Sequence, residues 1–167
     1  MTQSKPGVSL EQLMAEYGTV LLRTCCLYLR DYHLAEDAVQ ETFIKAARGL
    51  SRFHGESSLQ TWLIRIAINT CRDIQRSAWH RFVDRRIQAD TLSPLSAPAQ
   101  PDDAVLPAVA ALSTKYKDVI ILRFYHNLTL SDIAAVLSVP TQTAASRLRR
   151  AKAKLRRALE KEYFDEG

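Results

Sequence analysis

Positively charged side chains crowd into one stretch near the end of the chain, where their chemistry suits an anionic ligand. Between positions 147 and 157 every polar residue is a lysine or an arginine, and no acid follows until Glu160. An arginine can donate two hydrogen bonds to one guanine, and serine or glutamine can reach other base edges. A merely solvated helix usually mixes the two signs of charge at a spacing of four residues. The pattern therefore favours a nucleic-acid-binding face, with the solvated helix as the alternative. The cations are Arg147, Arg149, Arg150, Lys152, Lys154, Arg156 and Arg157.

Two helical segments and a tight turn within residues 127–159 would position these cations. Thr129 and Asp132 form a T-x-x-D capping signature before a short apolar run, and Thr141 is expected to cap the second helix. Ser138-Val139-Pro140 interrupts the first helix, because proline cannot continue a helix interior. The second helix carries an apolar stripe at helical spacing. This arrangement predicts a helix-turn-helix whose basic second helix can enter a major groove. The stripe consists of Ala144, Leu148, Ala151, Leu155 and Leu159.

The composition is that of a globular chain with an anionic partner. The 167 residues are 47% hydrophobic and 25% charged, with a net charge of +5 and a pI near 9.3. This length allows one domain or two small ones. No apolar run reaches the roughly 18 residues that a membrane span needs, and we expect no signal peptide because the N-terminus lacks its apolar segment.

The residue types that serve catalysis and metal binding are not arranged for either. Cys25, Cys26 and Cys71 are odd in number and lack C-x-x-C spacing, which argues against a disulfide framework and against a zinc site. We expect them to act as small hydrophobic residues in a reducing cytosol. His33 lies in a turn and is expected to be structural or exposed. Because no nucleophilic serine or tyrosine has clustered carboxylates, the sequence predicts no catalytic site, no metal site and no cofactor.

A protein-docking surface is predicted on the second of two N-terminal helices, which cover residues 9–30 and 34–50. Asp37, Gln40, Glu41 and Ile44 share one face of this helix, opposite an alanine-rich stripe. An exposed isoleucine among acids and an amide is unusual for a solvated face. We therefore interpret the face as a small docking surface in the helix-face style, with an ordinary solvated face as the alternative.

A third helix is predicted from Ser57, which forms an S-x-x-Q capping box with Gln60, to about Gln75. One of its faces combines three cations with an amide, which suits a nucleic-acid backbone and one base edge. Trp62 lies at core spacing and is expected to be buried rather than to stack on a base. The face consists of Arg65, Asn69, Arg72 and Arg76.

The remainder of the chain is predicted to form a linker followed by a compact four-helix domain. Prolines, serines and alanines between residues 78 and 103 predict an extended linker. Two helices, over residues 104–112 and 114–125, are expected before the helix-turn-helix, with Ser113 as a cap. We expect the end of the chain, residues 160–167, to fray. The residues of the second helix expected to face inward are Tyr116, Val119, Ile120 and Phe124.

Three of these segments, in this order, resemble the extracytoplasmic-function (group 4) sigma factors of bacterial RNA polymerase. Residues 31–43 (DYHLAEDAVQETF) resemble the polymerase-binding helix, residues 53–69 (FHGESSLQTWLIRIAIN) the segment that follows it and melts DNA, and residues 127–155 the C-terminal helix-turn-helix. The resemblance implies an all-α fold of two small helical domains joined by an extended linker. The domains would be residues 1–77, which bind polymerase and the minus-10 element, and residues 104–167, which bind the minus-35 element.

The resemblance also implies roles for individual residues. The β′ clamp helices of core RNA polymerase would be contacted by Asp37, Gln40 and Glu41, with Ile44 beside them. The minus-10 element, with one flipped base held in the loop and the duplex opened near Asn69, would be contacted by Phe53, Gly55, Glu56, Ser57, Arg65, Asn69 and Arg72. The minus-35 element would be contacted by Thr129, Ser131, Gln142, Thr143, Ser146, Arg147, Arg149 and Arg150.

The family further implies a cytoplasmic protein without enzymatic activity or a small-molecule substrate. Its partners would be promoter DNA, core polymerase through the β′ clamp helices and the β flap, and an anti-sigma factor, which in many relatives is anchored in a membrane. The chain departs from the family pattern in three places. Ser138 and Gln142 stand where glycine is common, and Ala145 stands where lysine or arginine is usual, so the minus-35 sequence of better-known members does not transfer. A stand-alone helix-turn-helix regulator is the alternative function.

Overall fold

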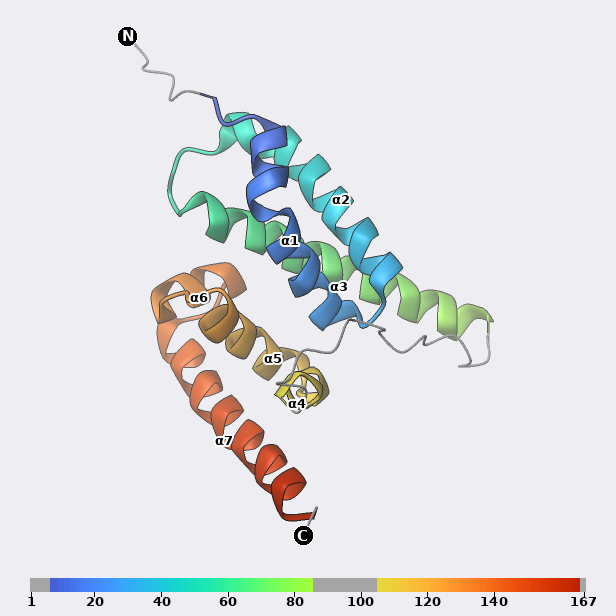
Figure 1. Ribbon diagram of the computed structural model, residues 1–167. Helices are drawn as coiled ribbons and strands as arrows, with labels where there is room; N and C mark the ends of the chain where they lie inside the picture. Colours follow the sequence, from blue (N-terminus) through green and yellow to red (C-terminus); the bar gives the residue numbers. More distant parts are fainter. Residues whose placement is uncertain (1–6, 86–104, 166–167) are drawn as a thin grey trace. The chain divides into compact units, whose positions relative to one another are not determined.

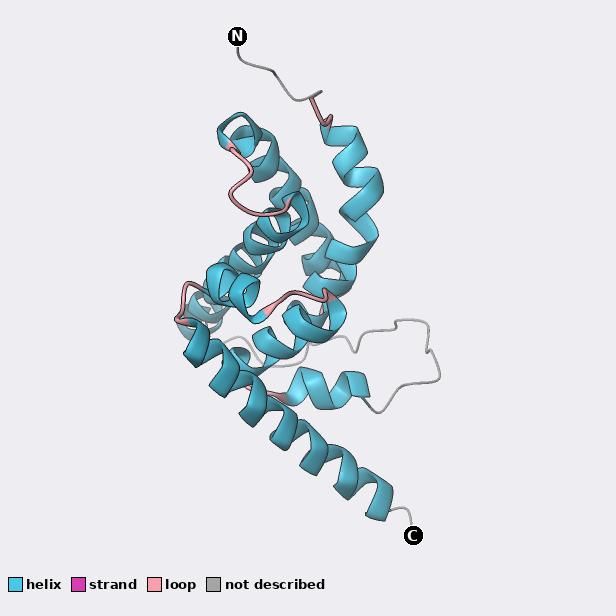
Figure 2. Ribbon diagram, turned by 90° about the vertical axis from the view of Figure 1, so that its left-hand side faces the viewer, coloured by secondary structure: helices cyan, strands magenta, loops and turns pink. Residues whose placement is uncertain are grey.

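The computed structural model describes residues 7–85 and 105–165, which divide between two compact units, Met1–Leu95 and Ser96–Gly167 (Figure 1). Every regular element of the described residues is a helix (Figure 2). The prediction of an all-α chain with two small helical domains is therefore confirmed. Most of the predicted linker, residues 86–103, lies outside the described residues.

The first unit packs three helices around one core: α1 (Leu10–Leu29), α2 (Tyr32–Gly49) and α3 (Leu59–Arg85), with a short 3₁₀ turn at Leu50–Arg52 after α2. Side chains from α1 and α3 fill its centre, and the small residues Ala35, Ala38 and Ala46 let α2 pack closely against them. The largest fully buried side chains are Leu13, Leu21, Leu63, Ile64 and Ile68.

Local capping determines where these helices begin. A capping box begins α1, because Ser9 Oγ accepts the Gln12 N–H at 3.2 Å and Gln12 Oε1 accepts the Ser9 N–H at 3.0 Å. At α2, Asp31 Oδ1 accepts the Leu34 N–H, so the helix begins at Tyr32 rather than Leu34. These caps satisfy N–H groups that have no partner inside the helix.

Two predictions about the ends of α3 are wrong. The cap is Ser58 rather than Ser57: Ser58 Oγ accepts the Thr61 N–H at 3.1 Å, while the Ser57 hydroxyl donates to the Ser58 carbonyl. At the other end α3 does not stop near Gln75 but continues to Arg85. The reason is that no glycine or proline occurs between Gly55 and Pro94 to interrupt it.

The second unit contains α4 (Val105–Ala111), α5 (Thr114–Ile120), α6 (Leu130–Leu137) and α7 (Thr141–Asp165). A π-helical turn, Ile121–Tyr125, extends α5, with the His126 N–H donating to the Ile121 carbonyl at 3.1 Å. This wider turn shifts the helical register. Phe124, predicted to point inward, is 57% exposed, and Ile121 and Leu122 are buried instead.

The turn between α6 and α7 has the geometry of a helix C-cap followed at once by a new helix. Ser138 adopts a left-handed conformation with φ of 55°, and the Val139 N–H donates to the Ala134 carbonyl at 3.0 Å. The Pro140 carbonyl accepts the Ala144 N–H, so Thr141 is the first helical residue rather than the cap. At its other end α7 remains helical to Asp165, and fraying of the end of the chain stays a prediction.

Candidate nucleic-acid interface and docking face

The basic face predicted on α7 is present, with Arg149 and Arg150 exposed and Arg147 partly buried. Ser146 and Thr143 are partly buried beside them, and Gln142 is exposed in the first turn. Ala144, Leu148 and Ala151 form the buried stripe that fixes α7 to its unit. Leu155 and Leu159, which continue the predicted stripe, are only partly buried. The cations Arg149 and Arg150 therefore stand opposite the part of α7 that is packed against its unit, as a groove-reading helix requires.

Two predicted contact residues lie at the start of α6, Thr129 as its N-cap and Ser131 in its first turn, and only one of them has an uncommitted side chain. Ser131 is exposed. The Thr129 hydroxyl is already committed to the helix end, because it accepts the Asp132 N–H at 3.2 Å and donates to the Asp132 carboxylate at 2.8 Å. A DNA contact from Thr129 would have to share this oxygen with the cap.

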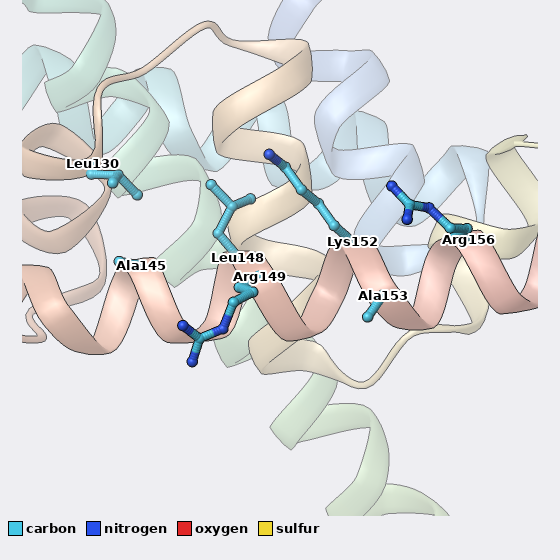
Figure 3. A pocket seen from close by; sticks show the side chains of 7 residues that line it. All are labelled: Leu130, Ala145, Leu148, Arg149, Lys152, Ala153 and Arg156. Atoms are coloured by element: carbon cyan, nitrogen blue, oxygen red, sulfur yellow. The ribbon is translucent and has the colours of Figure 1, made fainter.

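A groove of about 390 Å³ runs beside α7, and Leu130 and Ala153 are the residues lining it that the sequence analysis did not name (Figure 3). Leu130, Ala145, Leu148 and Ala153 give it an apolar floor, and Arg149, Lys152 and Arg156 flank it. Lys152 also places its ammonium 5.5 Å from the centre of the exposed Phe124 ring. The small Ala145 side chain, one of the family departures, is part of what leaves this space open.

The docking face predicted on α2 is exposed on the solvent side of the helix. Asp37, Gln40 and Ile44 are exposed, Ile44 by 45%, and Glu41 is partly buried. None of the three polar side chains forms a hydrogen bond or ion pair with another residue in the described part of the chain. An apolar side chain and three uncommitted polar groups thus lie on one helix surface.

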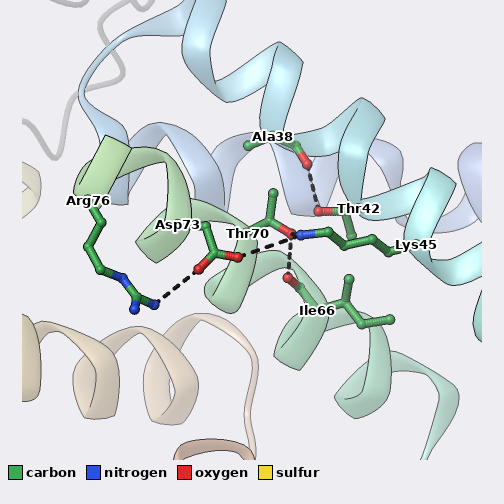
Figure 4. A network of polar contacts seen from close by, with 7 residues as sticks. All are labelled: Ala38, Thr42, Lys45, Ile66, Thr70, Asp73 and Arg76. Atoms are coloured by element: carbon green, nitrogen blue, oxygen red, sulfur yellow. Dashed lines mark hydrogen bonds and ion pairs between the residues drawn. The ribbon is translucent and has the colours of Figure 1, made fainter. Parts of the chain in front are cut away.

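On α3 the four predicted residues also share one side, with Arg65, Asn69 and Arg76 exposed and Arg72 partly buried. A polar network next to them joins α2 to α3 (Figure 4). Lys45 Nζ donates to Thr70 Oγ1 at 3.1 Å and lies 3.8 Å from Asp73 Oδ2, and Arg76 donates to Asp73 Oδ1 at 3.0 Å. Arg76 is therefore already engaged, whereas Arg65 and Asn69 face solvent.

The loop between α2 and α3 presents an exposed tip on a fixed base. His54, Gly55 and Glu56 are exposed, and Gly55 has a φ of +77°, a conformation that glycine tolerates best. Phe53 and Ser57 are partly buried. Trp62, predicted to be buried, is only partly so, and its ring centre lies 5.1 Å from that of Phe53.

The cysteines behave as packing residues. Cys25 and Cys71 are fully buried and Cys26 is partly so. A hydrogen bond with Cys71, together with burial, raises the pKa of the Cys25 thiol far above its ordinary value. Within the described residues, no three acids, histidines and cysteines come together as a metal site, and no helix is long and apolar enough to span a membrane.

Comparison with known proteins identifies the two units. Residues 13–81 match the family Sigma-70 region 2, and residues 102–155 match Sigma-70, region 4. The ECF RNA polymerase sigma-E factor of Haemophilus influenzae is 32% identical over 131 residues, which cover 70% of this chain and 69% of that protein. The chain belongs to the ECF sigma factors of bacterial RNA polymerase. The RNA polymerase sigma-H factor of Pseudomonas aeruginosa is another relative, 29% identical over 163 residues, or 89% of this chain and 84% of that one.

The fold of this sigma factor is also found among solved structures. The sigma factor RpoE, solved with the anti-sigma factor NepR from Bartonella quintana, has a TM-score of 0.73 and 26% identity, covering 90% of this chain and 98% of that one. CnrH, solved with the cytosolic domain of CnrY, has a TM-score of 0.67 and 25% identity, covering 90% and 87%. This sigma factor binds core RNA polymerase and directs promoter-specific initiation. The stand-alone regulator is not favoured, because region 2 accounts for the N-terminal helices.

Proposed function

We propose that this sigma factor docks on core polymerase through the solvent face of α2, against the β′ clamp helices. The observation that carries this proposal is the exposure of Ile44 next to Asp37, Gln40 and Glu41, whose polar groups are not used inside the described fold. Polar groups that are free before binding can form interfacial hydrogen bonds without breaking internal ones.

The second unit is proposed to contact the β flap of the polymerase. The exposed Phe124 and Tyr125 offer apolar area for this contact.

The minus-10 element is assigned to the loop after α2 and the adjoining face of α3. The tip residues, His54, Gly55 and Glu56, are open to solvent and can surround a base that has left the stack. Arg65 can hold the backbone, and Asn69 can hydrogen-bond a base edge as the duplex opens. The assigned residues are Phe53, Gly55, Glu56, Ser57, Arg65, Asn69 and Arg72.

The minus-35 element is assigned to the exposed face of α7, with support from α6. Arg149 and Arg150 are exposed on a helix that Ala144, Leu148 and Ala151 fix to its unit, so they can reach guanine edges or phosphates. Thr129, Ser131, Gln142, Thr143, Ser146 and Arg147 surround them. Ala145 contributes a methyl group where the family usually has a cation, which removes one hydrogen-bonding contact from this face.

An anti-sigma factor is proposed as the regulatory partner. Two structurally similar sigma factors, RpoE and CnrH, were each solved with a protein partner, NepR and the cytosolic domain of CnrY. We further propose that this sigma factor works in the cytoplasm with polymerase and catalyses no covalent step itself. Its contribution to initiation is binding energy, larger for melted promoter than for duplex.

The docking assignment is tested with purified core polymerase and run-off transcription. Asp37→Lys combined with Gln40→Ala should weaken core binding by about 2–5 kcal/mol if these contacts are buried, while the thermal midpoint stays unchanged because both residues are exposed. Glu11→Lys, a charge reversal at an exposed position of α1, is the matched control and should bind normally. Unchanged core affinity in the double variant would remove α2 from the interface.

The melting role is tested separately with two templates. Asn69→Ala should impair open-complex formation on a duplex promoter, and a template carrying a pre-melted bubble should restore activity, because the cost of unpairing has been removed. Equal defects on both templates would show that Asn69 does not act in strand opening.

A further inference from the structure

An aromatic contact joins the start of the loop assigned to the minus-10 base to the first turn of α3. The Phe53 and Trp62 rings are tilted by 36° with centres 5.1 Å apart, within the range in which aromatic pairs attract each other. Phe53 is the first residue of the loop, and Trp62 lies in the first turn of α3, where its N–H donates to the Ser58 carbonyl at 3.1 Å. The ring pair thus joins the two ends of the loop.

Gly49, the last residue of α2, makes room for this arrangement. A Cβ atom built on Gly49 would lie 3.1 Å from Trp62 Cζ2 and 3.8 Å from Cη2, the first of which is closer than ordinary van der Waals contact. The backbone of Gly49 is helical, with φ of −94° and ψ of −12°. A left-handed conformation therefore does not explain the glycine, whereas the approach of the Trp62 ring does.

The loop tip has no comparable support. His54 and Glu56 are exposed, and neither side chain has a hydrogen bond or ion pair with another residue that the structure describes. The position of the tip is therefore set by its two ends, namely the Phe53 ring and the Ser58 cap of α3. A displacement of the Trp62 ring would be transmitted to Phe53 and from there to the tip.

We propose that Gly49, Trp62 and Phe53 form a brace that positions the minus-10 loop, and that the close packing of Gly49 on Trp62 sets where the loop tip meets its base. Gly49 and Trp62 are positioning residues in this brace, whereas Phe53 is also among the residues assigned to the minus-10 element. This inference rests on the proposed function of the loop. It assigns promoter discrimination to a glycine and a tryptophan that act through the fold.

Gly49→Ala is the most direct test, because alanine favours the helix more than glycine does and so should not unfold α2. The added methyl group should shift the Trp62 ring by a few tenths of an ångström. We expect discrimination among minus-10 base substitutions to fall roughly three- to tenfold, with core-polymerase affinity and the thermal midpoint maintained. The probe is a promoter selected with the reconstituted wild-type holoenzyme, with single-base changes across its minus-10 element.

Two further variants show whether an effect of Gly49→Ala comes from its contact with Trp62. Gly18→Ala is the matched control, because a Cβ there would meet nothing within 4 Å, and it should discriminate as the wild type does. Gly49→Ala combined with Trp62→Phe should recover part of the lost discrimination, because the phenyl ring lacks the benzo atoms that face Gly49. The brace is contradicted if Gly49→Ala discriminates like Gly18→Ala, or if the double variant is worse than Gly49→Ala alone.

A tip variant separates the brace from the function of the loop. Glu56→Ala should change minus-10 discrimination directly if the loop reads a base. If Glu56→Ala changes it and Gly49→Ala does not, the brace is wrong and the loop assignment stands. If both variants leave discrimination unchanged while the wild-type holoenzyme discriminates, the loop does not read the base and the proposed function of the loop fails together with the brace.

Discussion

Lys45 on α2 donates a hydrogen bond to the Thr70 hydroxyl on α3 at 3.1 Å, next to the face assigned to strand opening. Lys45→Met keeps most of the aliphatic stem but removes the donor, and it should lower the free energy of unfolding by about 0.5–1.5 kcal/mol. The Asp73 ion pair adds little, because both side chains are substantially exposed. Urea unfolding of Lys45→Met, Thr70→Val and the double variant gives the interaction free energy between the Lys45 and Thr70 side chains. Purely additive effects would mean that this hydrogen bond does not stabilise the unit.

The turn of the helix-turn-helix carries removable backbone strain at Ser138. Its φ of 55° is left-handed, a conformation that a side chain disfavours and glycine does not. Ser138→Gly should therefore raise the free energy of unfolding by about 0.5–1 kcal/mol. Ala135→Gly, at an exposed position within α6, is the control and should have the opposite sign. Denaturant midpoints of the two full-length variants measure both effects, and a destabilising Ser138→Gly would show that the serine side chain contributes a contact of its own.

Acid stability should depend on His126, which is buried after the π-helical turn. Burial lowers the pKa of His126 from 6.5 to about 4. Between these pH values the unfolded chain binds a proton that the folded chain does not, so stability falls as the pH drops through this window. The loss from this group should be up to about 3 kcal/mol. Urea unfolding between about pH 7.5 and pH 4.5 should show a shallower acid decline for His126→Leu than for the wild type. The same decline in both proteins would exclude this histidine as its source.

Arg150 tests whether α7 reads bases or holds phosphates. If Arg150 contacts a base, Arg150→Ala should cost about 1–3 kcal/mol and relax preference at one minus-35 position. If it contacts a phosphate, the loss of affinity should be uniform across sequences. The slope of log K against log salt concentration should then fall in magnitude by about one. Arg157→Ala is the control, because Arg157 is exposed two turns further along α7 and is not among the residues assigned to the minus-35 element. Binding is measured with holoenzyme over a salt series, and an unaffected Arg150→Ala would make this side of α7 an ordinary solvated face.

Helix existence and the buried stripes were predictable because both follow from hydrophobic spacing. Ala35, Ala38, Thr42 and Ala46 are buried at the positions that the period requires, and Asp37 and Gln40 consequently face solvent. Helix ends were less predictable because neighbouring residues compete for the same role. The adjacent serines 57 and 58 are chemically equivalent as caps, and only the geometry of the loop decides between them.

Features that depend on tertiary contact were not predictable from spacing. The π-helical turn that exposes Phe124 inserts one residue into an otherwise regular pattern. The role of Gly49 depends on the ring of Trp62, thirteen positions away in the chain. The site residues on α2, α3 and α7 were placed on exposed faces by periodicity, whereas their individual roles came from family resemblance and stay predictions.

The most direct test of this account is a promoter spacer series transcribed with the reconstituted holoenzyme. If both units bind one polymerase through separate surfaces while each holds its own promoter element, the two elements must keep one spacing and one helical phase. B-DNA turns once in roughly 10–10.5 bp, so inserting about 5 bp moves one element to the opposite face. The account predicts that this insertion abolishes transcription and that a full-turn insertion does not restore it, because the distance is then wrong. Activity that stays level across the series would contradict docking of both units on one polymerase.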